Sequence, residues 1–398
     1  MRFLFTLWGL LLITGCSSKE NLNGHWKLLV KLQDQELPVL IQLKQEKKLL
    51  IGTLYNSSEK IKLSGSIDKN IFTLSIGTTD AILTGKVKDS KINGHWVRTK
   101  RKDYKVPFSG LKTTSESLFK PYQSKQNLMN VSGKWKINLG KDRIGLGVFL
   151  QKGSRISGSI LTNSGDMRFL DGHILKDKAF LYGFDGVFSF VINFHFSYEK
   201  FEAKMHAGKS YNTSITGARD DLFELADPLT LTKLTSKEPL HLKLKDINGA
   251  QVHFNEGVLK GKVKIVQLFG SWCPNCIDES HFFIQWRKDH AAKLNDVEII
   301  AVAYENYATE LKAIKELRKL RMKLSLEYPL VIGDFKSTKT VTDLFPIDKT
   351  RAFPTTLYLN RKNEVVKIHT GFNGQATGQY FLSFQEQFNQ IIDDLIKE

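Results

Sequence analysis

The segment GSWCPNCIDES, residues 270–280, holds two of the three cysteines of this 398-residue chain. It follows an apolar run at residues 263–269 that is typical of a buried strand, and it precedes aromatic side chains at helical spacing in residues 282–286. Cys273 is therefore expected at the start of a helix, with Cys276 one turn further along. Unpaired N–H groups and the helix dipole stabilise a thiolate there, so the segment predicts a reactive thiol.

Three kinds of site can use two cysteines at this spacing. A zinc site needs further ligands, and His281 and His290 would have to fold back to supply them. A purely structural disulfide would close a very small loop and restrict the unfolded chain little. In a redox pair, Cys276 attacks a mixed disulfide formed at Cys273. The redox interpretation agrees best with the strand and helix around the motif, and we expect neither a metal nor another cofactor.

The sequence WCPNC after an apolar strand, with FPTT at residues 353–356 before another strand, resembles the thioredoxin fold. More narrowly, it is similar to the TlpA/ResA-like thiol-disulfide oxidoreductases, which are exported and membrane-tethered. The similarity covers residues 238–398. It implies that Cys273 is the exposed nucleophile and that Cys276 is the resolving thiol.

The same resemblance implies roles for residues around the cysteines. Pro354 matches the cis-proline that faces the sulfurs, and Phe353 before it would offer backbone hydrogen bonds to an incoming peptide. Glu279 matches an acidic residue that tunes thiol protonation, with an exposed helical glutamate of no such role as the alternative. Trp272 would shield the disulfide, or would simply pack.

Two positions depart from the family pattern. Gln267 stands where thioredoxins have a buried aspartate, so proton transfer would have to use water or Glu279. His281 stands where relatives commonly have a helix-kinking proline, which predicts a straighter helix. Neither change removes the cysteine chemistry.

Strands and helices alternate after residue 238, which predicts a mixed sheet covered by helices. A hairpin is expected at residues 240–254, with Asn248 and Gly249 as its turn. Strands are expected at residues 263–269, 297–303, 328–332, 355–359 and 365–368. Apolar stripes mark two further helices: Leu311, Ile314, Leu317 and Leu320 on the first, and Phe381, Phe384, Phe388, Ile391 and Leu395 on the last.

Residues 23–220 show short strand-like segments broken by turn residues, without a helical period. The sequence NGHW occurs at residues 23–26 and again at 93–96, and SGKW follows at 132–135. We therefore predict two tandem all-β antiparallel units, at residues 23–113 and 131–220, each with room for about eight strands. They would form small barrels or strongly curved sheets, or else one large shared sheet, with a connector at residues 114–130.

Both units repeat an apolar-x-Gly-x-apolar pattern, at Gly65, Gly85, Gly158 and Gly172. Glycine at a fixed place in successive strands suits a curling sheet, where a side chain would crowd the bend. The Gly-x-Trp sequences weakly resemble the lipocalin signature, whose barrels hold apolar ligands. The alternative is that Trp26 and Trp135 plug the ends of their sheets.

The chain begins with Met-Arg, an apolar run at residues 3–13 and then Thr-Gly-Cys16, which is typical of a secretory signal peptide ending near residue 16. This stretch resembles the lipobox of bacterial lipoproteins, which implies lipidation of Cys16. The alternative is an ordinary signal peptide with a chance cysteine. No later apolar segment has the ~20 residues of a membrane helix. We expect an exported protein, lipid-anchored to a bacterial membrane and facing the periplasm.

The formal net charge is +17, and most of it lies before residue 237. Such a surface can attract anionic lipids, acidic glycans or acidic proteins, or it can be a solvated face without one partner. The export signal and the lack of a binding motif argue against nucleic acid. With Cys16 lipidated, only two cysteines remain, which excludes a disulfide scaffold.

The sequence thus predicts a membrane-anchored oxidoreductase that reduces protein disulfides through Cys273 and Cys276, with electrons from a membrane thiol carrier. Peroxide reduction is disfavoured, because no Pro-x-x-x-Thr-x-x-Cys arrangement is present. The alternative from another class is a binding lipoprotein, in which the β units capture a ligand or partner and the thioredoxin-like domain is a scaffold.

Overall fold

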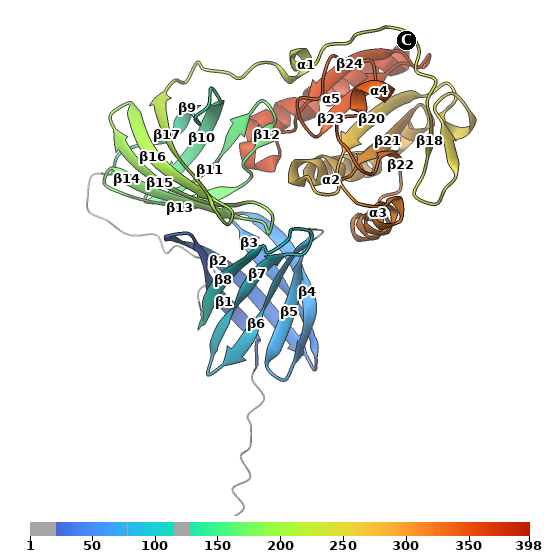
Figure 1. The fold of residues 1–398 in the computed structure, drawn as a ribbon. Helices are drawn as coiled ribbons and strands as arrows, with labels where there is room; N and C mark the ends of the chain where they lie inside the picture. Colours follow the sequence, from blue (N-terminus) through green and yellow to red (C-terminus); the bar gives the residue numbers. More distant parts are fainter. Residues whose placement is uncertain (1–20, 78, 115–127) are drawn as a thin grey trace, which may run out of the picture.

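The computed structural model describes residues 21–77, 79–114 and 128–398, so the predicted signal peptide, Cys16 and most of the connector lie outside the described residues. Three parts follow one another along the chain (Figure 1): a barrel, a second barrel and a domain of helices around a sheet. Among the described residues, no helix combines the length and apolar character needed to cross a bilayer.

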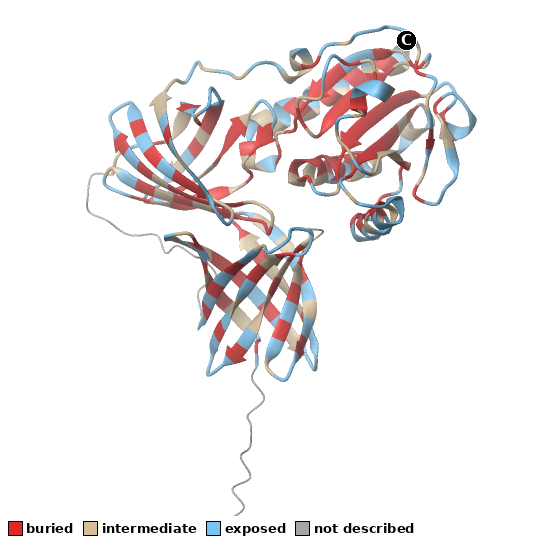
Figure 2. Ribbon diagram, in the orientation of Figure 1, coloured by how far each residue is buried: buried red, intermediate tan, exposed pale blue. Residues whose placement is uncertain are grey.

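The first barrel is closed and antiparallel, and each strand pairs with its neighbour in sequence. Pairing of β1 with β8 closes the ring, for example His25 opposite Thr113. Buried and exposed residues alternate along the strands (Figure 2), as expected for a sheet with one face on a core. The strands are β1 (Gly24–Leu32), β2 (Gln35–Glu46), β3 (Leu49–Asn56), β4 (Glu59–Asp68), β5 (Ile71–Ile76), β6 (Ala81–Lys88), β7 (Lys91–Arg98) and β8 (Lys105–Thr113).

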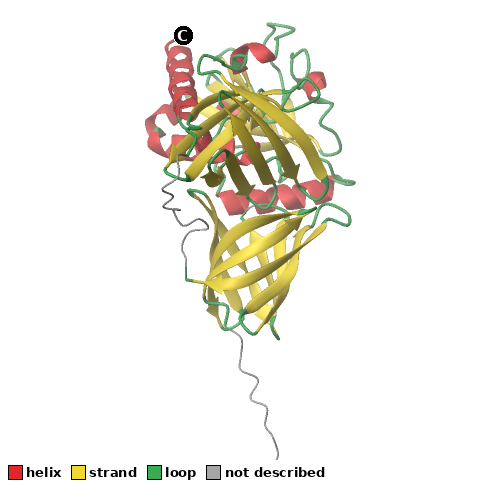
Figure 3. Cartoon of the chain, turned by 90° about the vertical axis from the view of Figure 1, so that its left-hand side faces the viewer, coloured by secondary structure: helices red, strands yellow, loops and turns green. Residues whose placement is uncertain are grey.

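The second barrel repeats this arrangement, and Figure 3 shows the two as separate units. It closes through β9–β17 and β10–β11 pairing, while the short β12 extends the sheet beside β11. The prediction of two eight-stranded units is confirmed, and one shared sheet is excluded. The strands are β9 (Gly133–Asn138), β10 (Ile144–Lys152), β11 (Arg155–Thr162), β12 (Gly165–Asp166), β13 (Leu170–Leu175), β14 (Lys178–Phe184), β15 (Ser189–Ser197), β16 (Lys200–Ala207) and β17 (Tyr211–Arg219).

Equivalent tryptophans occupy equivalent places in the two barrels. The indole N–H of Trp26 donates to the carbonyl of Leu22 (2.9 Å), and that of Trp135 donates to the carbonyl of Val131 (3.0 Å). All four residues are fully buried in apolar clusters that fill the barrels. The tryptophans therefore act as packing residues in these cores, as the second interpretation of the Gly-x-Trp sequences predicts.

The repeated glycines lie where neighbouring strands approach too closely for a side chain. A Cβ atom on Gly65 or Gly85 would lie 1.8 or 2.4 Å from a carbonyl oxygen of the adjacent strand. The corresponding distances for Gly158 and Gly172 are 2.0 and 1.7 Å. Real Cβ atoms do not approach carbonyl oxygens so closely, so glycine permits the tight coiling that closes each ring.

The third part is a five-stranded sheet in the order β22-β21-β20-β23-β24, with β20, β21 and β22 parallel and β23 and β24 antiparallel. Apolar side chains of α2, α3 and α5 cover one face, and the β18–β19 hairpin and α4 cover the other. The elements are α1 (Pro228–Leu231), β18 (Lys243–Lys245), β19 (Gln251–His253), η1 (Gly257–Leu259), β20 (Val263–Phe269), α2 (Pro274–Asp289), η2 (Ala291–Asn295), β21 (Val297–Tyr304), α3 (Glu310–Leu324), β22 (Leu330–Asp334), α4 (Val341–Leu344), β23 (Thr355–Leu359), β24 (Val365–Thr370), η3 (Gln375–Thr377) and α5 (Gln379–Lys397).

The mixed sheet predicted for this region is confirmed, with one error in the assignment of helix faces. Leu311 was expected on the buried stripe of α3 but is 80% exposed. The buried residues of α3 are Ala313, Leu317, Leu320 and Leu324. Leu311 lies in the first turn of the helix and off its buried stripe, so the spacing alone was misleading.

Replacing Gly172 by alanine should destabilise the second barrel by about 1–3 kcal/mol, because the new methyl group would overlap the carbonyl of Phe180. Urea unfolding of the purified protein measures this change. The control is Glu202→Ala on the exposed face of β16, where a change within about 0.5 kcal/mol is expected. Equal stability of the two variants would contradict the crowding argument.

Candidate active site

The two cysteines lie at the N-terminus of α2 and form a disulfide with a Cα–Cα distance of 5.3 Å. Cys273 is the N-cap residue, and its Sγ accepts a hydrogen bond from the backbone N–H of Cys276 (3.2 Å). Pro274 occupies the first helical position, where a missing N–H leaves no intrahelical bond unmade. This end of the helix favours negative charge, so a thiolate at Cys273 is stabilised.

Cys273 is 6% exposed and Cys276 is fully buried, so only the first sulfur borders solvent-accessible space. The Phe353–Pro354 peptide bond is cis, and the Phe353 carbonyl oxygen lies 3.3 Å from Cys273 Sγ. In the reduced protein that carbonyl can accept a hydrogen bond from the Cys273 thiol. The sequence places these residues about 80 positions apart, and the sheet brings them together because β23 pairs with β20.

Trp272 packs beside the disulfide on the solvent side. Its ring lies edge-on to Phe353 with centroids 5.6 Å apart, and its indole N–H donates to the Tyr304 carbonyl (3.0 Å). The side chain is still 40% exposed. It is therefore held in a fixed position without being part of the hydrophobic core, which suits a side chain that borders the reacting sulfurs.

A buried glutamic acid lies one turn behind the resolving cysteine. Glu279 is fully buried and accepts hydrogen bonds from Gln267 Nε2 and Thr356 Oγ1, each at 2.9 Å. Burial raises the pKa of Glu279 to about 8, against the opposing effect of these two hydrogen bonds. The alternative of an exposed surface glutamate is therefore wrong.

Gln267 links this glutamate to the cysteine motif. Its amide also donates to the backbone carbonyl of Cys276 (3.1 Å), and its side-chain oxygen accepts from Ser280 Oγ (3.2 Å). Gln267 lies in β20 at the place of the buried thioredoxin aspartate, and here the acid comes from the neighbouring helix instead. Glu279 can therefore hold a proton inside the domain near the resolving cysteine.

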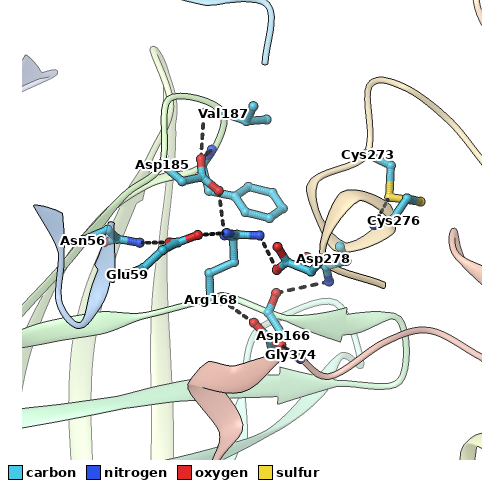
Figure 4. Close-up of polar contacts among 12 residues, drawn as sticks. Asn56, Glu59, Asp166, Arg168, Asp185, Val187, Cys273, Cys276, Asp278 and Gly374 are labelled. Atoms are coloured by element: carbon cyan, nitrogen blue, oxygen red, sulfur yellow. Dashed lines mark hydrogen bonds and ion pairs between the residues drawn. A yellow bond between two sulfur atoms is a disulfide. The ribbon is translucent and has the colours of Figure 1, made fainter. Parts of the chain in front are cut away.

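One buried arginine joins all three parts of the chain behind this helix (Figure 4). Arg168, in the β12–β13 connection of the second barrel, is 8% exposed. Its guanidinium forms ion pairs with Glu59 of the first barrel, with Asp185 of the second barrel and with Asp278 of α2. Asp278 lies two residues after Cys276, so the barrels are attached directly to the redox helix.

A second set of contacts lies beside the arginine. The Asp166 carboxylate accepts hydrogen bonds from the backbone N–H groups of Arg168 and Gly374, both at 2.5 Å. Its backbone carbonyl lies 3.4 Å from the side-chain amide of Asn275, inside the cysteine motif. A Cβ atom on Gly165 would lie 2.0 Å from that amide, so only glycine allows the barrel to approach so closely. Burial raises the pKa of Asp166 to about 6.

The described residues contain no group of three or more His, Cys, Asp or Glu side chains arranged to hold a metal ion. A thioredoxin-like sheet, a disulfide at the start of α2 and a cis-proline beside it define the class of thiol-disulfide oxidoreductases. Residues 231–379 match the Redoxin family model. The C-terminal part of this chain is accordingly a Redoxin domain of the TlpA/ResA-like oxidoreductases.

Among known proteins, the thiol-disulfide oxidoreductase ResA of Halalkalibacterium halodurans is 29% identical over 136 residues, 34% of this chain and 68% of that protein. ResA of Bacillus subtilis is 28% identical over 128 residues, 32% of this chain and 63% of the relative. Among solved structures, a secreted thiol-disulfide isomerase from Corynebacterium glutamicum aligns with a TM-score of 0.34 and 14% identity, covering 44% of this chain and 97% of that one. The Redoxin match begins after the last barrel strand.

The structure brings together Trp272, Cys273, Cys276, Phe353 and Pro354, which the sequence had selected for this site, and it places Glu279 just behind them. The sequence did not identify Arg168, Asp166 or Asp278. Their contacts between the barrels and the redox domain join residues more than 100 positions apart and leave no local pattern in the chain. No signal in the sequence would therefore have identified these three residues.

Substituting Glu279 by glutamine should remove a pH dependence of stability. An unfolded glutamate has a pKa near 4.5, whereas the folded group has a pKa of about 8, so the folded protein binds the proton more tightly between these values. The stability of the oxidised wild type therefore falls as pH rises from 4.5 to 8, and the variant lacks this part of the loss. Thermal melts at both ends of the window test this, with Glu202→Gln as the exposed control; identical pH profiles for all three proteins would contradict it.

Replacing Arg168 by methionine should loosen the barrels from the redox domain. It leaves the buried carboxylate of Asp185 and the partly buried carboxylates of Glu59 and Asp278 without their cation, and breaking a buried pair typically costs about 3–5 kcal/mol. We expect a larger radius of gyration in solution scattering and faster hydrogen exchange at the start of α2. Asp278→Asn, which removes a single partner, should give a smaller change in the same direction.

The matched control is Arg155→Met, which removes an ion pair with Asp171 inside the second barrel. Its solution scattering should equal that of the wild type. An unchanged radius of gyration in both Arg168→Met and Asp278→Asn would show that other contacts hold the domains together.

Proposed function

We propose that this protein is a membrane-anchored, extracytoplasmic oxidoreductase that reduces protein disulfides through its Cys273-Pro-Asn-Cys276 motif. The observation that carries the proposal is the disulfide at the N-terminus of α2, with only Cys273 bordering solvent and the cis-Pro354 peptide beside it. The similarity to ResA proteins supports the reaction type.

The reaction starts from the dithiol form. The Cys273 thiolate attacks one sulfur of the substrate disulfide, and the other substrate sulfur leaves as a thiolate that takes up a proton. Cys276 then attacks Cys273 Sγ, which releases the second substrate thiol and closes the internal disulfide. Two electrons and two protons pass to the substrate in total. A membrane thiol carrier would return the electrons by the same exchange in reverse.

The surrounding residues have separate roles in this proposal. The backbone of Phe353 would align the substrate segment as an added strand, and Pro354 would keep that edge open beside the sulfurs. Glu279, protonated below about pH 8, would supply a proton to the Cys276 thiolate when the internal disulfide is reduced again. Trp272 would shield the internal disulfide from water. Lipidation of Cys16 would hold the protein at a bacterial membrane on the periplasmic side.

The domain division that goes with this function is two β units at residues 23–113 and 131–220 followed by the redox domain at 238–398. The cores of both barrels are filled by their own apolar side chains. This packing favours a role for the outer surfaces of the barrels over a role in binding a ligand inside them.

The proposal predicts a reduction potential of roughly −250 mV or lower for the Cys273–Cys276 pair, the range of thioredoxin-type reductants. Thiol trapping and mass spectrometry in graded redox buffers measure it. A potential near about −120 mV would reverse the direction of electron flow and make the protein an oxidant. Absence of a reversible disulfide would refute the enzymatic proposal.

Single-cysteine variants test the assigned order of attack. Cys276→Ser should accumulate a mixed disulfide between Cys273 and a protein substrate such as insulin, because the resolving step is missing. Cys273→Ser should lose insulin reduction and form no such adduct, since Cys276 is fully buried. Adduct formation at Cys276 in the Cys273→Ser protein would reverse the assignment.

A further inference from the structure

Cys273 opens into a cleft that the redox domain shares with the first barrel. The cleft measures about 830 Å³, and its lining includes Trp272, Cys273 and Pro274 on one side and the β7–β8 connection of the barrel on the other. A substrate that reaches Cys273 through this space must therefore pass the barrel surface. The β5–β6 connection and Val187 add to the barrel side of the cleft. The β21–α3 connection, α3 and the segment that follows β22 add to the side of the redox domain.

The barrel contacts the residues directly before the cysteine motif. Lys100, in the β7–β8 connection, lies with its Nζ 3.4 Å from Ser271 Oγ and 3.9 Å from a carboxylate oxygen of Glu316 in α3. Ser271 in turn donates its backbone N–H and its hydroxyl to the buried carboxylate of Glu305, each at 2.7 Å. Lys323 of α3 also bonds the barrel, through the carbonyl of Gly77 (3.2 Å).

Positively charged side chains predominate in the lining of this cleft. Eight lysine and arginine residues line it, against three aspartate and glutamate residues. Asp80 is paired with Arg98 inside the barrel, Glu305 is buried against Ser271, and Glu316 pairs with Lys100 and Lys319.

Five cations of the cleft form no ion pair with a carboxylate within the part of the chain that the structure describes: Arg101, Lys312, Lys323, Lys336 and Lys339. Partial desolvation at the domain junction, together with Lys319 and Lys100 nearby, lowers the pKa of Lys323. Positive charge is therefore in excess along the walls of the cleft into which Cys273 opens.

We infer that this cleft is a docking site for an acidic protein segment that carries the disulfide to be reduced, and that the first barrel and α3 set this specificity. Asp and Glu side chains of such a segment would pair with the five uncompensated cations while its disulfide meets Cys273. A recessed space between two domains fits a chain segment, whereas a flat bilayer would reach only its rim. The inference rests on the proposed function and adds the class of substrate.

The test uses the full-length reduced protein and three synthetic peptides of equal length. Each peptide carries one internal disulfide, flanked by glutamate, glutamine or lysine residues. Thiol trapping and mass spectrometry give the rate constant of exchange for each. We expect the glutamate peptide to react about tenfold or more faster than the lysine peptide, since steering of this kind changes association rates by about 10–10³. This preference should shrink as the salt concentration rises.

Two charge-reversed variants test whether the charge preference arises in the cleft or from the net charge of the protein. The first is a triple variant in the cleft that combines Lys312→Glu, Lys336→Glu and Lys339→Glu. It should abolish or reverse the ratio of glutamate to lysine peptide rates. The second is a control variant that combines Lys86→Glu, Lys88→Glu and Lys91→Glu. It makes the same change of net charge around the β6–β7 turn, at the opposite end of the first barrel. That variant should keep the wild-type ratio.

The outcomes separate this inference from the proposed function. Exchange with all three peptides at equal, salt-independent rates would overturn the inference and leave the oxidoreductase standing. An equal effect of both variants would also overturn it, because net charge and not the cleft would then act. Exchange with none of the peptides would refute the proposed function itself. Phosphatidylglycerol vesicles that block the glutamine peptide in the wild type but not in the cleft variant would show that the cleft binds lipid.

Discussion

The ion pairs of Arg168 are the contact on which the arrangement of this molecule depends. One guanidinium, almost removed from solvent, meets carboxylates from the first barrel, the second barrel and the redox helix. Removing charges from water is unfavourable unless each is paired, so the cluster is stable only when all three parts are in place. Figure 4 shows its carboxylates converging on the arginine from three directions. A single buried side chain thereby couples domain placement to the helix that carries the cysteines.

Because of this placement, the barrels flank the redox site, which would otherwise be exposed to solvent. The barrel turn at Lys100 lies against Ser271, and Asp166 and Gly165 of the second barrel lie against Asn275. The cysteine motif is thus contacted from both sides by parts of the chain that carry no redox chemistry. The interiors of the barrels are filled, and their outer surfaces border the cleft into which Cys273 opens.

The buried carboxyl group behind the cysteines comes from the helix and not from the strand position where thioredoxins have an aspartate. A neutral Gln267 occupies the strand position, and Glu279 supplies the carboxyl group from α2, one hydrogen bond away. Burial keeps that group protonated up to about pH 8, so it can donate a proton to a nearby thiolate in the range where thiols react.

The sequence by itself determined most of the elements and located the cysteine pair. Alternation, glycine spacing and the repeated Gly-x-Trp predicted two antiparallel β units, either barrels or strongly curved sheets. A cysteine pair between an apolar strand and a helix predicted the redox domain. These signals are local in the chain. The burial of Glu279, the exposure of Leu311 and the ion pairs of Arg168 were decided only by the tertiary structure. They depend on which surfaces meet across separations of many residues, and neither periodicity nor composition records that.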